Sequence, residues 1–179
     1  MKHVNVIVGR FQPFTDGHFK MIAEGFNYNG LPTVILQIPN KKFDERHPFS
    51  DELIKEEIDL ISKNNDYIAG HFYITNADIA KIANVCHENG FEPVLWICGT
   101  DRFEAYSKQA DNDKYKTDNN LLPEFKCLEV KRDEDDISAS KVREAIKNNE
   151  FTSYIGMMPG ICMSHTGIWT KFKEELSQL

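Results

Sequence analysis

Short apolar runs alternate with amphipathic segments along most of this chain. The run at 4–8 is apolar on both faces, as in a buried central strand. Further strands are predicted at 33–38, 71–75, 94–98 and 126–131, and helices from 17, over 50–61, 78–89 and 138–147, and at about 166–179. The polar run 111–120 is predicted to be an exposed loop. Strands that alternate with helices predict an α/β fold, a Rossmann-like open parallel sheet with helices on both faces, in a single domain.

The first strand leads into a loop that a hydrophobic core does not require. Gly9 allows the backbone to approach a ligand closely, and Pro13 fixes φ in the turn. Asp16 is predicted to cap a helix that begins near Gly17, with His18 among the unpaired N–H groups of its first turn. A helix start at the carboxyl end of a strand favours an anion such as phosphate. The alternative is a Gly-Pro turn with an incidental histidine.

A second helix start suited to phosphate lies far downstream, in the segment 137–143, Ile-Ser-Ala-Ser-Lys-Val-Arg. Ser138 is a natural N-cap, and its hydroxyl, that of Ser140 and the nearby N–H groups can hold phosphate oxygens. Lys141 and Arg143 lie on different parts of the first turns, so one can reach a phosphate while the other faces solvent. The alternative is a Ser-capped surface helix. The two helix starts together favour a phosphate site.

Both segments resemble signatures of the nucleotidyltransferase superfamily. Residues 9–18, Gly-Arg-Phe-Gln-Pro-Phe-Thr-Asp-Gly-His, resemble its HxGH/TxGH motif, and 137–143 resembles its ISxTxxR motif with Ser140 in place of Thr. The Gly-Arg-Phe-Gln-Pro lead-in is most similar to archaeal-type and phage nicotinamide mononucleotide (NMN) adenylyltransferases. Thr15, where those enzymes have the first histidine, is similar to phosphopantetheine adenylyltransferases. The resemblance implies one nucleotidyltransferase domain over 1–179, with the C-terminal helix packed on it.

The resemblance also implies which residues contact the nucleotide. It gives His18 and Arg143 the catalytic roles, at the triphosphate and the transition state. The implied nucleotide contacts are Gly9, Arg10, Phe11, Thr15, Gly17, His18, Gly99, Asp101, Arg102, Ser138, Ser140 and Arg143. The segment 99–102 is included because it resembles a Gly-x-Asp-Arg turn of phage-encoded and bacterial relatives. The alternative there is that Asp101 caps the next helix and Arg102 pairs with a carboxylate.

A basic loop at 39–48 is the predicted contact for the acceptor. Its His-Pro-Phe-Ser end is similar to the Asn-Pro-Phe-Thr segment of archaeal-type NMN adenylyltransferases. The possible acceptor contacts are Phe14, Lys41, Lys42, Arg46 and Phe49. A solvated loop, its charge partly balanced by Asp44 and Glu45, is an equally supported alternative. Trp96 lies in a predicted central strand, where core packing is the better interpretation.

Composition narrows the class of protein. The chain has 179 residues, enough for a full core, and its net charge of −7 argues against a general nucleic-acid or membrane-surface binder. Cys86, Cys98, Cys127 and Cys162 are widely spaced, which favours free thiols in a reducing compartment and no protein metal site. No signal peptide and no membrane-length apolar run is expected, because Lys2 leads directly into a short strand. We therefore expect a cytoplasmic protein.

The residues and the resemblance together predict a Mg²⁺-dependent transfer of AMP from ATP to NMN, giving NAD and pyrophosphate. The expected partners are ATP with its bound Mg²⁺, a small phosphate-bearing acceptor and, as in many relatives, further copies of the chain. One alternative is transfer of AMP or CMP to another phosphate, such as phosphopantetheine or a polyol phosphate. A second is an inactive nucleotide sensor, which Thr15 favours and which the intact His18, Ser138 and Arg143 oppose.

Overall fold

The computed structural model describes residues 1–133 and 136–179. These residues contain a five-stranded parallel sheet. Its strands lie in the order β3-β2-β1-β4-β5, and each neighbouring pair is parallel. The strands are β1 (Lys2–Gly9), β2 (Thr33–Gln37), β3 (Ile68–Tyr73), β4 (Phe91–Gly99) and β5 (Lys126–Val130). The predicted α/β, Rossmann-like class is confirmed.

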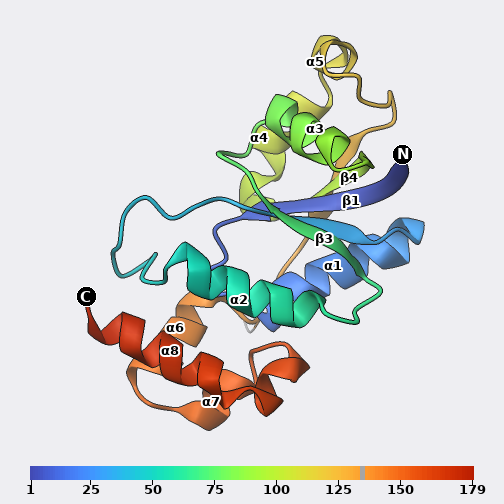
Figure 1. Cartoon of the computed structure of the whole chain (residues 1–179). Helices are drawn as coiled ribbons and strands as arrows, with labels where there is room; N and C mark the ends of the chain where they lie inside the picture. The colour runs from blue at the N-terminus through green and yellow to red at the C-terminus, as the bar shows by residue number, and fades with distance from the viewer. Residues whose placement is uncertain (134–135) are drawn as a thin grey trace. The chain divides into compact units, whose positions relative to one another are not determined.

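Helices follow each strand (Figure 1). They are α1 (Asp16–Asn29), α2 (Asp51–Ser62), α3 (Ile79–Glu88), α4 (Thr100–Ala110), α5 (Asp113–Asp118), α6 (Ala139–Lys147), α7 (Phe151–Ile155), the 3₁₀ helix η1 (Gly160–Ser164) and α8 (Thr166–Ser177). The predicted C-terminal helix corresponds to α8. Within the described ranges, no helix combines the length and the apolar character needed to cross a membrane.

The described residues group into two compact units that alternate along the sequence. The first unit contains 1–9, 21–38 and 66–133, and so holds the whole sheet. The second contains 10–20, 39–65 and 136–179, and so holds residues 10–18 of the first signature segment and all of the second. That residues 1–179 form one nucleotidyltransferase domain stays a prediction.

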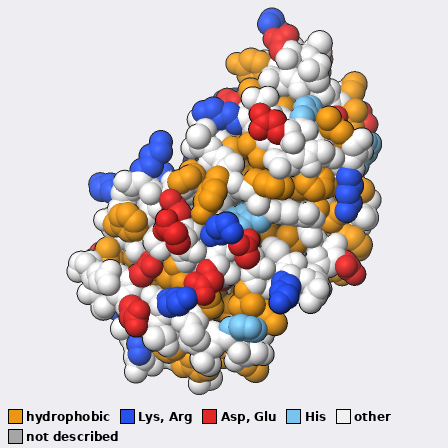
Figure 2. Space-filling model, viewed as in Figure 1, with side chains coloured by type: hydrophobic (Ala, Val, Ile, Leu, Met, Phe, Trp, Pro, Cys, Tyr) orange, Lys and Arg blue, Asp and Glu red, His pale blue; other side chains and the backbone are white. Residues whose placement is uncertain are grey.

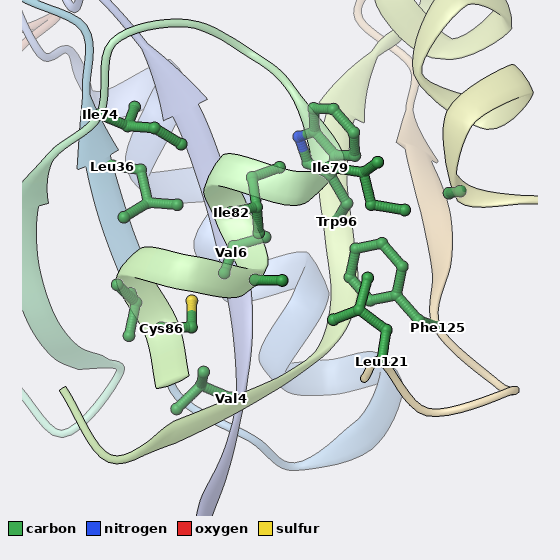
Figure 3. Close-up of a cluster of buried hydrophobic side chains, with 13 residues drawn as sticks. Val4, Val6, Leu36, Ile74, Ile79, Ile82, Cys86, Trp96, Leu121 and Phe125 are labelled. Atoms are coloured by element: carbon green, nitrogen blue, oxygen red, sulfur yellow. The ribbon is translucent and has the colours of Figure 1, made fainter. Parts of the chain in front are cut away.

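In the first unit, one face of the sheet packs against α3 and α4. Figure 3 shows Val6 of β1 beside Ile82 of α3, with Val4 of β1 and Trp96 of β4 in the same buried cluster. Trp96 has no exposed surface, and its ring stacks on Tyr106 of α4 at 4.1 Å between centroids. The assignment of Trp96 to the core is confirmed.

The opposite face of the sheet is covered by residues 21–29 of α1. A Cβ at Gly25 would clash with Cδ1 of Ile97, so glycine allows the helix to approach β4 closely. Asn5 and Asn29 exchange side-chain hydrogen bonds of 3.0 and 2.7 Å, which satisfy a polar residue in the middle of β1. The sheet is therefore covered on both faces, as its two-sided apolar strands predict.

The strand order reverses beside β1. The chain runs outward from β1 through β2 to β3, and then returns to the other side of β1 for β4 and β5. Ile7 of β1 pairs with Ile97 of β4, so Gly9 and Gly99 end neighbouring strands at the same edge of the sheet. Ligands of open α/β sheets bind at such a switch point.

In the second unit, α2 and α8 pack through aromatic and aliphatic side chains. Phe49, just before α2, lies 4.6 Å from the Phe172 ring of α8, between centroids. The helix predicted from residue 50 begins with Ser50 as its N-cap, and Glu175 of α8 accepts hydrogen bonds from the N–H and the hydroxyl of Ser50. On the face in Figure 2, acidic and basic side chains are interspersed. Lys171 of α8 pairs with Glu56 of α2 at 2.7 Å.

Two local predictions need correction. Asp16 does not precede α1 but is its first residue, and Thr15 is the capping residue, because its carbonyl accepts from Phe19 N–H and its hydroxyl from His18 N–H. The polar run 111–120 contains helix α5, capped by Asn112. Burial of Lys116, whose Nζ donates to the carbonyls of Pro123 and Phe125, holds this helix, and polarity alone does not reveal that contact.

Candidate active site

The loop after β1 is held in a specific shape by its own side chains. Phe11 has a positive φ of 54°, a conformation that costs a bulky residue about 1–3 kcal/mol and persists only when its surroundings impose it. The Gln12 side chain donates to the Phe49 carbonyl at 3.1 Å and accepts from the Phe49 N–H at 2.8 Å. The Gln12–Pro13 peptide bond is cis. The loop is therefore fixed against the segment that begins α2.

His18 is oriented by the backbone that precedes it. Its Nδ1 accepts the Thr15 N–H at 3.0 Å, and the Thr15 hydroxyl lies 3.2 Å from the same atom. Because Nδ1 acts as an acceptor, the neutral ring carries its proton on Nε2. Phe11 and Phe14 flank the ring, at 5.1 and 5.2 Å between centroids. His18 is thus an oriented donor with a defined tautomer.

The two signature segments meet at Gly17. A Cβ on this residue would lie 2.9 Å from the carbonyl oxygen of Ile137, the residue before the N-cap of α6. Any residue with a Cβ would clash with this oxygen, so only glycine fits here without a shift of the backbone. Ser138 caps α6 as predicted, since its hydroxyl accepts from the Lys141 N–H at 3.2 Å. The starts of α1 and α6, which are far apart in the sequence, therefore lie together in the second unit.

Arg143 joins the two segments through its side chain. Its Nη1 donates to the Gln12 carbonyl at 2.8 Å. Burial of half of the guanidinium lowers the pKa of Arg143, and the nearby Arg46 guanidinium lowers it further, whereas Asp44 opposes the shift. An arginine stays charged under these conditions. Two cations in one place repel each other, and an anion between them would relieve that repulsion.

A cavity of about 560 Å³ opens beside these two arginines. Arg46, Ser140, Arg143 and Lys147 supply its polar and positive walls, and Glu45 and Glu144 its negative ones. Leu176 and Leu179 of the C-terminal segment close one side, with Asn148 as the remaining lining residue. The cavity thus combines the first turn of α6 with several cations, a combination that suits phosphate groups.

The loop that carries Arg46 is ordered by internal hydrogen bonds. The Asn40 side chain donates to the carbonyls of His47 and Phe49, at 2.7 and 3.2 Å. Asp44 accepts the N–H groups of Arg46 and His47, at 3.0 and 2.9 Å. Burial raises the pKa of Asp44, but these two hydrogen bonds and the His47 side chain together outweigh burial, so the pKa lies below its ordinary value. Arg46 is part of this ordered loop, and its side chain lines the same cavity as that of Arg143.

The predicted site residues separate into several groups. Gly17, His18, Ser138, Ser140 and Arg143 lie around the helix starts described above. Arg10 is half-buried and Phe11 is 4% exposed, whereas Thr15 is 1% exposed and its hydroxyl contacts His18. Gly9, Gly99, Asp101 and Arg102 belong to the first unit. There Gly99 precedes α4, and Asp101 lies within its first turn and does not cap it.

The possible acceptor contacts are not gathered in one place. Phe14 and Phe49 have no exposed surface, so the structure offers neither ring to an acceptor, because both are needed for packing in the second unit. Lys41 and Lys42 are exposed. Arg46 lines the cavity with Arg143. These residues stay predictions as acceptor contacts, and the two phenylalanines are the least suited.

Sequence reasoning missed two residues that hold the signature loop, Gln12 and Glu57. Glu57 has no exposed surface and accepts the Phe14 N–H at 2.9 Å. The sequence contains a signal for it, because Glu57 lies midway between Leu53 and Ile61 at the four-residue spacing of the buried face of α2. An acidic residue in an otherwise apolar stripe indicates a specific partner.

Comparison with known families decides the class of protein. A family model described as cytidylyltransferase-like matches residues 6–145, which include both signature segments. The chain belongs to this family. It is therefore a nucleotidyltransferase, and the predicted superfamily and enzyme class are confirmed, whereas the archaeal-type or phage subtype stays a prediction. No curated protein sequence matches the chain.

Solved structures of similar fold include mononucleotide adenylyltransferases. The Plasmodium falciparum nicotinic acid mononucleotide adenylyltransferase complexed with APC aligns with a TM-score of 0.59 and 13% identity, over 96% of this chain and 98% of that chain. Its complex with NaAD aligns with a TM-score of 0.61 and 14% identity over the same shares. A bifunctional NMN adenylyltransferase/ADP ribose pyrophosphatase from Francisella tularensis, complexed with AMP and a manganese ion, aligns with a TM-score of 0.51 and 15% identity, over 97% of this chain and 52% of that chain. At these identities the likeness shows the fold alone.

Proposed function

We propose that this protein transfers AMP from ATP to nicotinamide mononucleotide in the presence of Mg²⁺, with NAD and pyrophosphate as products. The observation that carries the proposal is the close approach of Gly17 to the Ile137 carbonyl, at 2.9 Å from a Cβ placed there. This contact brings the helix starts of both nucleotidyltransferase signatures together, with His18 and Arg143 beside them.

The reaction needs charge neutralisation and alignment more than it needs a base. The acceptor phosphate is already an anionic nucleophile, so one of its oxygens attacks the α-phosphorus while the bond to the β-phosphate oxygen breaks. The departing electron pair leaves with pyrophosphate, and no proton has to be removed from the acceptor. Catalysis then depends on holding two anions in line and on stabilising the charge that grows on the α-phosphate and the leaving group.

His18 is assigned to the α-phosphate. Its Nδ1 is held by the Thr15 N–H, so Nε2–H is the atom that donates to a phosphate oxygen. A donor whose orientation is fixed in advance stabilises developing charge without reorganising during the reaction. Flanking by Phe11 and Phe14 keeps the ring from rotating.

Arg143, Ser140 and Arg46 are assigned to the leaving group. All three line the same cavity, and the repulsion between the two arginines falls when a polyphosphate lies between them. The N-terminus of α6 adds the backbone N–H groups that helix starts offer to phosphate. Under this assignment Arg46 serves the triphosphate and not the acceptor, in contrast to the prediction from sequence.

Mg²⁺ is proposed to arrive with ATP and to supply further neutralisation of the phosphate charge. Among the described residues, no group of three His, Cys, Asp or Glu side chains is placed to hold a metal ion. We therefore assign the metal ligands mainly to the oxygens of the triphosphate, which Mg²⁺ commonly uses. The Francisella tularensis structure that contains AMP and manganese supports a divalent ion at nucleotides of this fold.

NMN is the proposed acceptor because two independent features favour it. The Gly-Arg-Phe-Gln-Pro lead-in is similar to NMN adenylyltransferases, and the solved structures of similar fold include enzymes named for nicotinic acid mononucleotide and for NMN. A cytidylyltransferase-like family description keeps CTP and a polyol phosphate as the competing pair. We also propose a cytoplasmic location, which the free cysteines Cys86, Cys98, Cys127 and Cys162 support.

A substrate matrix tests the proposal. ATP and CTP are each combined with NMN, nicotinic acid mononucleotide, phosphopantetheine and glycerol 3-phosphate, with Mg²⁺ present, and pyrophosphate release is measured with product masses. We expect ATP with NMN to give the highest kcat/KM and NAD as the product. Pyrophosphate release with another pair alone would retain the reaction class and overturn the acceptor. Nucleotide binding without turnover in any pair would favour the inactive sensor.

A further inference from the structure

The buried carboxyl of Glu57 lies beneath the signature loop. Glu57 is on α2, has no exposed surface, and its Oε1 accepts the Phe14 N–H at 2.9 Å. Burial raises the pKa of Glu57 well above its ordinary value of 4.5, against the opposing effect of the Phe14 N–H. Tyr154 and Cys162 are its titratable neighbours, and burial raises the pKa of each of them as well. Burial therefore favours the neutral form of this carboxyl, and its titratable neighbours are buried in the same way.

Packing alone does not explain an acid at this position. An apolar side chain would extend the stripe of Leu53, Ile54 and Ile61 on α2 without the cost of burying a carboxyl. Only one of the two oxygens has a partner, because Oε2 forms no hydrogen bond within the described residues, and neither does the Tyr154 hydroxyl. A half-satisfied buried acid destabilises the fold, which indicates that the contact to Phe14 has another use.

The N–H that Glu57 holds is adjacent to the one that orients His18. Phe14 N–H points to Glu57, and the next N–H along the chain, that of Thr15, donates to His18 Nδ1 at 3.0 Å. The Phe14 ring also packs against the His18 ring, with 5.2 Å between centroids. A shift of the Phe14 backbone would disturb two contacts of His18 at once, the Thr15 N–H and the Phe14 ring.

We propose that Glu57 is a positioning residue for His18: its carboxyl holds the Phe14 backbone so that the Thr15 N–H stays on Nδ1 and the His18 proton stays on Nε2. The catalytic consequence rests on the proposed function, because it requires His18 to donate to a phosphate oxygen. The structural consequence, a single His18 tautomer controlled from α2, does not depend on any activity.

The tautomer is measured directly by the ¹⁵N shifts of the His18 ring, in protein labelled at histidine and at a pH where the ring is neutral. Glu57→Gln keeps an acceptor oxygen of the same reach, and Glu57→Met keeps the length without an acceptor. Ile58→Ala is the matched control, since Ile58 is the next residue of α2 and is fully buried, so its truncation destabilises the same helix without removing an acceptor.

We expect wild type, Glu57→Gln and Ile58→Ala to show the Nε2–H tautomer, and Glu57→Met to show a mixture of both. An unchanged tautomer in folded Glu57→Met, or a mixture in Ile58→Ala to the same extent, overturns the proposal. If Glu57→Met does not fold, amide hydrogen exchange of Phe14 and Thr15 decides. Protection that is present in wild type and retained in Glu57→Gln supports the proposal, and protection that is absent in wild type or lost in Glu57→Gln overturns it.

Turnover separates this inference from the proposed function. With an active substrate pair, Glu57→Met should lower kcat about 10–100-fold with KM for both substrates changed less than threefold, and Glu57→Gln should restore it. A tautomer change with unchanged kcat would retain the positioning role and contradict the role of His18. An unchanged tautomer with lower kcat would contradict the positioning role alone.

Discussion

Arg143 donates from Nη1 to the backbone carbonyl of Gln12 at 2.8 Å, a contact between residues 131 positions apart. The donor belongs to the second signature and the acceptor to the first. Since one guanidinium nitrogen is held by the loop, the orientation of the remaining N–H groups toward the cavity is fixed before a nucleotide binds. This relationship links the two motifs more directly than their order in the sequence does.

Replacement of Arg143 by Lys tests that link. An ammonium retains the charge but lacks the planar fork, so it cannot hold the Gln12 carbonyl and a phosphate in the same geometry. We expect kcat/KM for ATP to fall about 10–100-fold, because a charge-assisted hydrogen bond contributes about 1.5–3 kcal/mol. Lys141→Ala is the control, because Lys141 is exposed and its Nζ donates to the Asp136 carbonyl. Equal losses in both variants would contradict the assignment of Arg143.

Truncation of His18 should affect turnover and spare folding. Loss of one oriented donor at developing charge lowers kcat by about 10²–10³-fold. We expect His18→Ala to show this loss in steady-state kinetics, with circular dichroism and thermal unfolding close to wild type. His165→Ala, at an exposed position before α8, should keep full turnover. An unfolded His18→Ala variant would indicate a structural histidine, and nearly full turnover would remove it from the mechanism.

Gly17 and Gly167 form a matched pair, because each is the second residue of a helix. Gly17→Ala places a Cβ 2.9 Å from the Ile137 carbonyl oxygen, so we expect a loss of about 1–3 kcal/mol in the free energy of unfolding, together with lower activity. Gly167→Ala meets no atom within 4 Å and should leave stability unchanged or raise it by up to about 1 kcal/mol. Denaturant unfolding of both variants measures the difference. Equal effects would mean that α1 and α6 do not meet as described.

The Arg46→Ala variant tests whether Arg46 binds the triphosphate of ATP or the acceptor. If Arg46 shares the leaving group with Arg143, KM for ATP should rise about tenfold or more, while KM for the acceptor changes little. Lys81→Ala, at an exposed position on α3, serves as the control. A rise in the acceptor KM alone would restore the assignment that the sequence favours.

The stability of the protein should depend on pH through Glu57. Its pKa is raised in the folded state, so above 4.5 the unfolded chain releases a proton that the folded protein retains. The stability that this group contributes is complete below pH 4.5 and is lost as pH rises toward the folded pKa, with a slope of at most about 1.4 kcal/mol per pH unit. Glu57→Gln removes this slope, so its free energy of unfolding should gain on wild type as pH rises. A constant difference from pH 4.5 upward would show that Glu57 is ionised in the folded protein.

The sequence pattern located most helices and strands, because their positions depend mainly on interactions between residues that are close in the chain. The apolar run at 4–8 is β1, the helices predicted from residues 50 and 78 are α2 and α3, and Ser138 caps α6 as predicted. Predictions failed where a distant contact decided the outcome. The polar segment at 111–120 contains α5, because carbonyls beyond it bind the buried Lys116.

By itself, the sequence determined the fold class, the places where α1 and α6 begin, and the family, since each depends on residue types at fixed spacing. The tertiary structure alone decided that Gly17 meets Ile137, that Arg46 lies beside Arg143 and that Glu57 supports the loop of His18. It also removed Phe14 and Phe49 from the exposed surface. The reason is that burial and contact between residues distant in sequence depend on how helices pack, whereas capping and periodicity are set within a few residues of the chain.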